Sequence, residues 1–314
     1  MPMNNKQVRV VDQILTTVAR GYQNPQFVGN RLFPVVPVMS SGGQIITFDK
    51  SSWRKYNLRR APGADVVEID YGYAGAPYAL VQDSVHGKVP REHLRDANQV
   101  PGINLGTIAT NTAMSAIQRS QEIEQASLAR NAANYSASNK ADLSASSWNN
   151  PDRNPVTDIK TGKQSIADQT GFEPNVFTLS GDAWNALSSN PHVLGLFTRG
   201  EVENLILTPQ MLASKLDLAE IVIGRASYIN ENNATVKAWG TDAILAYTEI
   251  GSPTNALPSY GYTYTLEGNP VVEQPWYNKS NKSWMYPVNN EYSPVIAGAD
   301  AGYLFTGAGA AFAG

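Results

Sequence analysis

The residues that could do acid–base, metal or nucleophilic chemistry form no recognisable catalytic pattern in this sequence. The three histidines, His86, His93 and His192, are widely spaced, and no HExxH pair occurs. His86 and His93 could share a metal with nearby carboxylates, but surface histidines close to a loop end are the simpler interpretation. No G-x-S-x-G elbow is present, and the chain has no cysteine, which excludes disulfides and cysteine nucleophiles. We therefore expect no catalytic, cofactor or metal site.

Paired carboxylates and a phosphate loop are also unsupported. Glu122 and Glu124 lie two residues apart on a predicted helix, so they point in different directions and cannot form a catalytic pair by themselves. Solvated faces or ion pairs between chains are the simpler interpretation of these residues. Thr161-Gly162-Lys163 is similar to the end of a phosphate loop, but Thr157 stands where the first glycine should be.

Basic and aromatic residues alternate over positions 53–60, which could suit nucleic acid through phosphate contact and stacking. The members of this cluster are Trp53, Arg54, Lys55, Tyr56, Arg59 and Arg60. The interpretation that we favour is contact with an acidic surface of a neighbouring copy, since complementary charge sets the register between copies. Glu68 and Asp70, a little further along the chain, are candidates for that surface.

The segment Tyr22–Val38 predicts an apolar arm. Pro34 and Pro37 each remove a backbone donor and favour extended geometry before them, so this segment is neither a helix nor a good central strand. Its apolar side chains must be buried against something else, and another copy of the chain is the partner that we expect. The candidate contact residues in the arm are Phe27, Arg31, Leu32 and Phe33.

Composition narrows the class of protein further. The 314 residues can bury a large core, as one elaborate domain or two smaller ones. A net charge of −3 argues against a chain that grips nucleic acid over its whole surface. No apolar run approaches the length of a membrane span, and the N-terminus lacks the apolar stretch of a signal peptide. The sequence thus predicts a soluble protein made in the cytoplasm.

Patterning predicts the elements that surround these segments. A short helix opens the chain, and residues 40–90 form a long two-stranded loop that returns as an extended segment over 77–89. Residues 104–135 contain no proline and predict one helix of roughly 30 residues, whose alanine-rich face should pack closely on a sheet or another backbone. Short helices and strands over 157–250, including a helix capped by Thr208 with Pro209 in its first position, predict a compact α/β unit.

Several phrases of the sequence together resemble the major capsid proteins of tailed double-stranded DNA bacteriophages, which share the HK97-type fold. They are YQNPQFVGNRLFPVVPV, TFDKSSWR, RRAPGADVVEIDY, QEIEQASLARNAANY, TGFEPNVFTLSGDAWNAL, LTPQMLASKLDLAEIVIGRASY and VKAWGTDAILAY. They are spread over most of the chain, and it is their order that carries the resemblance.

The resemblance implies an α+β fold with five parts. These are an N-terminal arm (1–38), an extended loop (39–90), a peripheral domain with its spine helix at about 104–135 (91–156), an axial domain (157–250), and a C-terminal return to the peripheral domain with a tail (251–314). The long N-terminal scaffolding segment of some family members is not expected here, so the resemblance favours a separate scaffolding protein, or assembly without one.

The function implied is structural. Copies of the chain would form hexamers and pentamers of an icosahedral virion capsid around double-stranded DNA, with non-specific DNA contact, a portal at one vertex and a possible decoration protein. Assembly would take place in the host bacterial cytoplasm, without a membrane. One alternative is an encapsulin-like compartment, which an apolar cargo groove on the inner wall would indicate. Another is a carbohydrate-active hydrolase, which converging carboxylates in a pocket would support.

Overall fold

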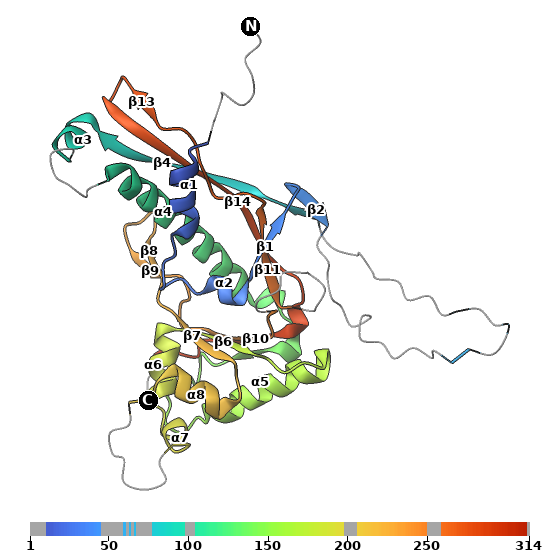
Figure 1. The fold of residues 1–314 in the computed structure, drawn as a ribbon. Coiled ribbons are helices and arrows are strands. Elements are labelled where there is room, and N and C mark those ends of the chain that lie inside the picture. Colours follow the sequence, from blue (N-terminus) through green and yellow to red (C-terminus); the bar gives the residue numbers. More distant parts are fainter. Residues whose placement is uncertain are drawn as a thin grey trace.

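The computed structural model describes residues 11–44, 59–60, 63, 66, 77–97, 104–197, 206–249 and 259–312. Two β-sheets, each covered by helices, lie one beyond the other (Figure 1), and the long helix α4 (Leu105–Arg130) runs along the first toward the second. Within these ranges, no helix has both the length and the apolar character needed to cross a membrane.

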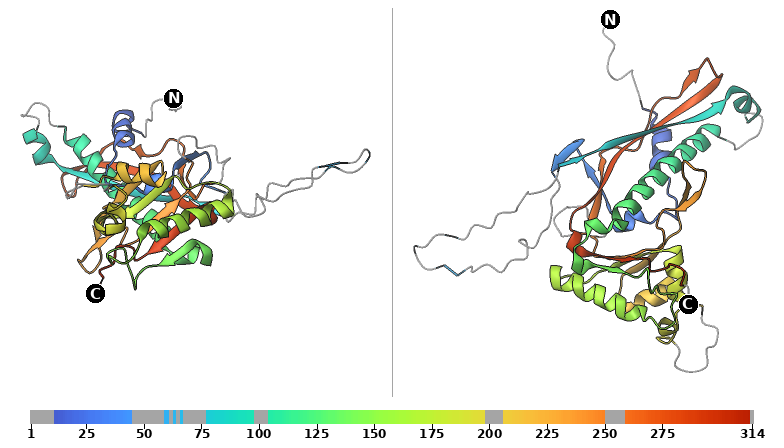
Figure 2. Two further views of the ribbon diagram at one scale, coloured as in Figure 1. Left: turned by 90° about the horizontal axis from the view of Figure 1, so that it is seen from below. Right: turned by 180° about the vertical axis from the view of Figure 1, so that it is seen from behind.

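The first sheet has six strands built around β14 (Ser283–Ile296). Its order is β1 (Val35–Val38), β11 (Gly261–Leu266), β14 and β12 (Val271–Val272), while β4 (Val81–Pro90) and β13 (Trp276–Asn278) also pair with β14. β1 runs parallel to β11, and every other pairing in this sheet is antiparallel. Helices α4 and α1 (Gln13–Gly21) pack against the sheet (Figure 2).

Helix α4 begins at Asn104, whose side-chain oxygen accepts a hydrogen bond from the Thr107 amide at 3.1 Å. Its packing on β4 is close, because a Cβ atom on Gly87 would lie 2.5 Å from the carbonyl oxygen of Ala109. The expectation that an alanine-rich helix face packs tightly on a sheet is therefore confirmed.

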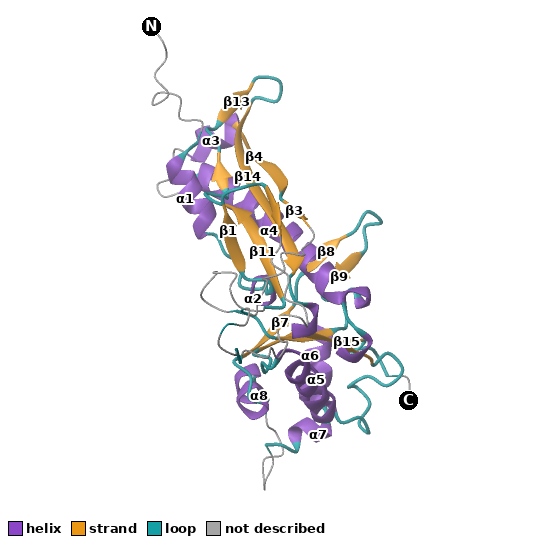
Figure 3. Ribbon diagram, turned by 90° about the vertical axis from the view of Figure 1, so that its right-hand side faces the viewer, coloured by secondary structure: helices purple, strands orange, loops and turns teal. Residues whose placement is uncertain are grey.

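The second sheet has five strands in the order β5 (Lys140–Asp142), β15 (Gly302–Thr306), β10 (Ala243–Ala246), β6 (Val176–Ser180) and β7 (Glu220–Gly224). Four helices accompany it (Figure 3): α5 (Pro155–Thr170), α6 (Gly181–Ser189), α7 (Pro191–Leu194) and α8 (Pro209–Leu216). Its core includes Trp148, Phe177 and Phe305, which are fully buried and in mutual ring contact.

Short elements complete the described chain. They are α2 (Gly29–Leu32), α3 (Arg91–Ala97), the ribbon of β2 (Gly42–Gln44) with β3 (Pro77–Ala79), the ribbon of β8 (Ser227–Ile229) with β9 (Thr235–Lys237), and 3₁₀ turns at Ala132–Asn134, Ala137–Asn139 and Ala299–Ala301.

Strand pairing corrects the boundaries expected from the sequence. β5 and β15 join the five-stranded sheet, although residues 91–156 and 251–314 were expected to belong to the other unit. β1 of the arm and β4 of the extended loop belong to the six-stranded sheet. Such pairings join residues far apart in the chain, so local sequence patterns do not specify them.

Candidate assembly surfaces

The arm of the chain lies on the chain's own six-stranded sheet. The Thr263 amide donates to the Pro34 carbonyl at 2.9 Å, and the Glu267 amide donates to the Val38 carbonyl at 2.8 Å, as parallel pairing of β1 with β11 requires. Leu32 and Phe33 have no exposed surface. The prediction that these two residues contact a neighbouring copy is therefore wrong, because β11 and helix α4 of the same chain bury them.

A buried carboxylate fixes the arm to helix α4. Glu122, only 2% exposed, accepts hydrogen bonds from the amides of Val28 (3.0 Å) and Gly29 (2.8 Å) and from the indole nitrogen of Trp239 (2.7 Å). Burial raises the pKa of Glu122, while these three hydrogen bonds lower it by a smaller amount. The expectation of a solvated face or an interchain ion pair is wrong for this residue.

Side-chain amides extend this contact. The Asn30 side-chain oxygen accepts hydrogen bonds from Gln121 and Gln125, each at 2.9 Å, and Gln125 also donates to the Thr263 hydroxyl at 2.8 Å. The start of the arm is therefore held against α4 by polar groups that are satisfied within one chain.

A second link joins α4 to the five-stranded sheet. The Arg130 guanidinium lies 2.6 Å from the Asp242 carboxylate and also donates to the Ala238 carbonyl at 3.0 Å. Asp242, which is 4% exposed, accepts a further hydrogen bond from the Gly307 amide at 2.8 Å. Arg130 and Glu122 thus both bind the 238–242 segment and hold the two sheets in one orientation.

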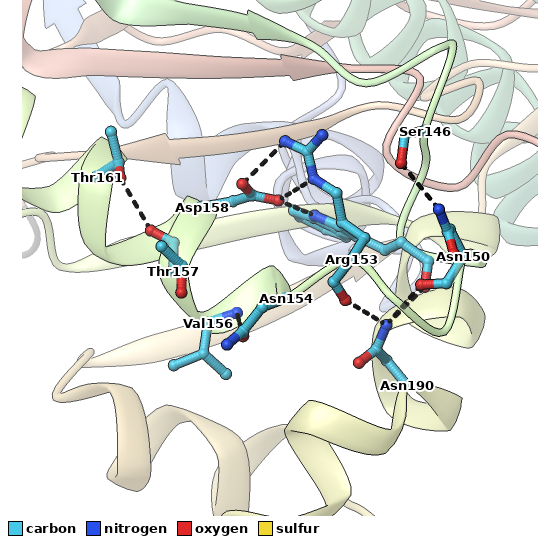
Figure 4. A network of polar contacts seen from close by, with 10 residues as sticks. Ser146, Asn150, Arg153, Asn154, Val156, Thr157, Asp158, Thr161 and Asn190 are labelled. Carbon is cyan, nitrogen blue, oxygen red and sulfur yellow. Dashed lines mark hydrogen bonds and ion pairs between the residues drawn. The ribbon is translucent and has the colours of Figure 1, made fainter.

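The polar loop before α5 is fixed in the same way (Figure 4). Asp158 accepts two hydrogen bonds from Arg153, both at 2.9 Å, and one from the Trp148 indole at 3.0 Å. Asn190 donates to the carbonyls of Trp148, Asn150 and Arg153. These contacts join the loop to α5 and α7, so this charged cluster has a structural role.

A cavity of about 470 Å³ lies between α5 and α8. Lys163 in its wall donates to the carbonyls of Leu216 and Asp217, at 2.9 and 3.1 Å, and lies 3.2 Å from the Glu173 carboxylate. Its ammonium group therefore neutralises the carbonyl end of α8. The lining of this cavity also includes the Asp217 carboxylate and two further lysines, Lys160 and Lys215, so cations and carboxylates are mixed there.

The other predicted contact residues are partly described. Phe27 is half-buried beside the core around Trp239, and the exposed Arg31 lies 3.9 Å from the Glu220 carboxylate. Arg59 and Arg60 are exposed. The remaining candidates lie outside the described residues: Trp53, Arg54, Lys55, Glu68 and Asp70.

The histidines are separated in the structure. His86 is on β4 with its ring 6.2 Å from that of Trp276, His93 is on α3, and His192 is on α7. In the ranges that the structure describes, no three His, Asp or Glu side chains are gathered as metal ligands.

Sequence reasoning missed the role of Glu122. Its neighbours in the chain give no signal, because the three donors come from the arm and from Trp239. A buried Glu can be recognised only once the helix face that it occupies is known.

Known proteins are similar to this chain both in sequence and in fold. No family model matches the chain. The sequence is 32% identical over 305 residues to the major capsid protein of the Burkholderia phage BcepMu, covering 96% of this chain and 97% of that protein. The crystal structure of a phage-related protein from Bordetella bronchiseptica RB50 is 40% identical, with a TM-score of 0.82, and covers 97% of this chain and 100% of that one.

An encapsulin complex from Synechococcus elongatus has the same fold, with a TM-score of 0.54 and 10% identity over 93% of this chain and 90% of that one. The chain therefore has the HK97-type fold of shell-forming proteins: a long helix joins two sheets, and an arm lies along the first sheet. Within that class, the chain belongs to the family of phage major capsid proteins, and its place is the virion capsid.

Proposed function

We propose that the chain is a structural subunit that assembles with its own copies into hexamers and pentamers. These close an icosahedral shell around double-stranded DNA, and assembly takes place in the host bacterial cytoplasm. The observation that carries the proposal is 32% sequence identity to a phage major capsid protein over 96% of this chain.

Exposed apolar side chains support assembly. Ile14 on α1, Met39 directly after β1 and Ile206 shortly before α8 are 79%, 90% and 87% exposed. Burying such side chains between copies is favourable at about 25 cal/mol per Å² of apolar surface. Because each subunit of a closed shell contacts several neighbours, modest contacts add up to a stable particle.

The contacts between copies in this proposal are made by the remaining predicted residues. Phe27 and Arg31 provide them in the arm, and Arg59 and Arg60 provide them in the extended loop together with Trp53, Arg54, Lys55, Glu68 and Asp70. Leu32 and Phe33 are left out, since they are buried in their own chain.

The proposed role is mechanical, with no catalytic step and no cofactor. Its partners besides other copies are a separate scaffolding protein, a portal at one vertex, a decoration protein and the packaged DNA. Contact with DNA is weak and independent of sequence, which suits a chain of net charge −3. The encapsulin-like alternative shares the fold alone, whereas the relative at 32% identity is a phage capsid protein.

Negative-stain electron microscopy and light scattering of the purified chain test this function. We expect closed shells, or hexamers and pentamers. A stable monomer of 34.0 kDa at micromolar concentration, with and without a co-expressed scaffolding protein, would contradict it.

A further inference from the structure

Polar side chains gather where helix α4 crosses strands β4 and β14. Asp83 on β4 and Asn290 on β14 are opposite each other in the antiparallel pair, so their side chains lie on one face of the sheet. Tyr292, two residues further along β14, shares that face, and its hydroxyl donates to Asp83 Oδ2 at 2.8 Å. Tyr292 also packs in one cluster with Met114 and Ile117 of α4. The face that carries these polar groups is therefore the face that α4 covers.

Helix α4 adds a second carboxylate to this cluster. The Ser120 side chain hydrogen-bonds to the Tyr292 hydroxyl, and Glu124 is one turn later on the same face of the helix. Partial burial raises the pKa of Glu124, and the nearby Asp83 carboxylate raises it further. Asp83 and Glu124 therefore repel each other when both are ionised.

No side-chain cation offsets this repulsion in the part of the chain that the structure describes. The ion pairs within 4.0 Å there include neither Asp83 nor Glu124. The two carboxylates thus keep their negative charge at the edge of an otherwise apolar contact between helix and sheet.

A buried amide oxygen lies beside the two carboxylates. Asn290 is 6% exposed, and its Oδ1 accepts no hydrogen bond from any protein group among the described residues. A buried oxygen of this kind is costly unless a donor or a cation is bound to it. Asp83, the residue opposite Asn290, offers acceptor oxygens when it is ionised, so a positively charged partner suits both residues.

The kinds of oxygen present here are those that calcium binds. Ca²⁺ takes roughly six to eight oxygen ligands from carboxylates, amide carbonyls and waters, in a flexible geometry. Asp83, Glu124 and Asn290 supply the protein ligands, and the exposed position of Glu124 gives a hydrated ion access. His86 on β4 is an odd number of residues from Asp83 and lies on the other face of the strand. The cluster therefore lacks the nitrogen and sulfur ligands that zinc and copper prefer.

We propose that Asp83, Glu124 and Asn290 bind one Ca²⁺ ion between α4 and the six-stranded sheet. The ion neutralises both carboxylates, coordinates the Asn290 oxygen and ties the long helix to β4 and β14. Two charged ligands make a weak site, with a Kd of about 10⁻⁴–10⁻³ M. The inference does not depend on assembly, because all three ligands belong to one chain.

Thermal unfolding of the full chain tests the site. CaCl₂ at about 10 mM should raise the Tm of the wild type by about 2–5 °C over NaCl of the same ionic strength. Glu124→Gln, a change at an exposed position, should lose most of this shift, and so should Asp83→Asn. Glu231→Gln, in the exposed β8–β9 turn, is the matched control and should keep it.

Terbium luminescence gives a direct readout. Tb³⁺ occupies calcium sites and emits when a tyrosine close to it is excited, and the Tyr292 hydroxyl is hydrogen-bonded to the proposed ligand Asp83. The emission should saturate with Tb³⁺, be displaced by CaCl₂, and fall strongly in Asp83→Asn and in Tyr292→Phe. Tyr277→Phe, on β13, should leave it unchanged. Circular dichroism confirms that each variant is folded.

The outcomes separate this inference from the proposed function. A Tm shift no larger with CaCl₂ than with NaCl, or equal in the wild type and Glu124→Gln, overturns the calcium site. A terbium signal that Tyr292→Phe leaves unchanged overturns it as well, and so does a response to MgCl₂ without one to CaCl₂. Shells that form from a chain that binds no calcium leave the proposed function standing, whereas a calcium-binding chain that stays monomeric contradicts that function alone.

Discussion

At the scale of single residues, a buried carboxylate holds three parts of the chain together without a cation. Glu122 accepts three N–H donors, from the arm and from Trp239, and its pKa is raised because burial outweighs those hydrogen bonds. The folded protein therefore binds this proton more tightly than the unfolded chain does, and protonation of Glu122 favours folding.

The sign of the resulting pH dependence can be tested with Glu122→Gln. A carboxyl group whose pKa is raised on folding contributes stability below its unfolded pKa, about 4.5, and loses it as the pH rises through the folded value. We therefore expect the unfolding free energy of the wild type, minus that of Glu122→Gln, to fall as the pH rises from about 4.5 through the folded pKa of Glu122. Urea unfolding at a series of pH values measures it.

The comparison of the wild type with Glu122→Gln has an internal control. Burial also raises the pKa of Glu124, but this residue titrates in both proteins, so its contribution cancels in the difference. If the difference in unfolding free energy between the two proteins stays constant or rises with pH, Glu122 does not titrate as its surroundings indicate.

Gly29 allows the arm to approach the Glu122 carboxylate. A Cβ atom there would lie 2.0 Å from the Gln125 side-chain oxygen and 2.8 Å from Glu122, so both side chains would have to move. Gly29→Ala should cost about 1–3 kcal/mol of unfolding free energy. Gly21→Ala, with no atom within 4 Å of the new methyl group, is the matched control in thermal or urea unfolding. Equal effects of the two changes would contradict this account.

At the scale of elements, capping residues and the positions of proline predicted two of the helices. The absence of proline predicted α4, and Thr208 with Pro209 predicted the start of α8, where the Thr208 hydroxyl accepts from the Met211 amide. These signals act within a few residues, through capping and proline geometry.

Pairing over long distances could not be predicted in this way. β15 lies in the five-stranded sheet between β5 and β10, and the arm strand β1 pairs with β11 more than two hundred residues later. The apolar arm correctly indicated a need for burial, but its pattern is equally satisfied by the chain's own sheet and by a neighbour. Only the three-dimensional arrangement distinguishes them.

The link between α4 and the five-stranded sheet gives an element-scale prediction. Asp242→Asn would leave the Arg130 guanidinium without its carboxylate. Asp242 is buried but Arg130 is 34% exposed, so we expect a cost of about 1–3 kcal/mol in unfolding free energy. A double-mutant cycle with Arg130→Met should show strong coupling. Arg95→Met, at the exposed Arg95–Asp96 pair, should change stability by less than about 0.5 kcal/mol. Coupling as weak as that of a surface pair would contradict the proposed link.

At the scale of the whole molecule, charge is distributed unevenly along an elongated chain. The outer end of the six-stranded sheet carries the exposed cations Lys88, Lys279 and Lys282, with Glu92 paired to Arg91 beside them. The described residues of the five-stranded unit include many carboxylates, such as Asp142, Asp152, Asp168, Glu173 and Asp217. Such separation disfavours contacts between identical ends and favours head-to-tail contacts, which form closed rings when the rotation between copies closes.

Cryo-electron microscopy of the assembled particles tests the central claim most directly. The account predicts a closed shell of five- and six-membered rings in which each copy keeps its own β1 on its own β11 and its arm on Glu122. Absence of closed particles, with only the 34.0 kDa monomer in solution, would contradict the assignment as a shell subunit.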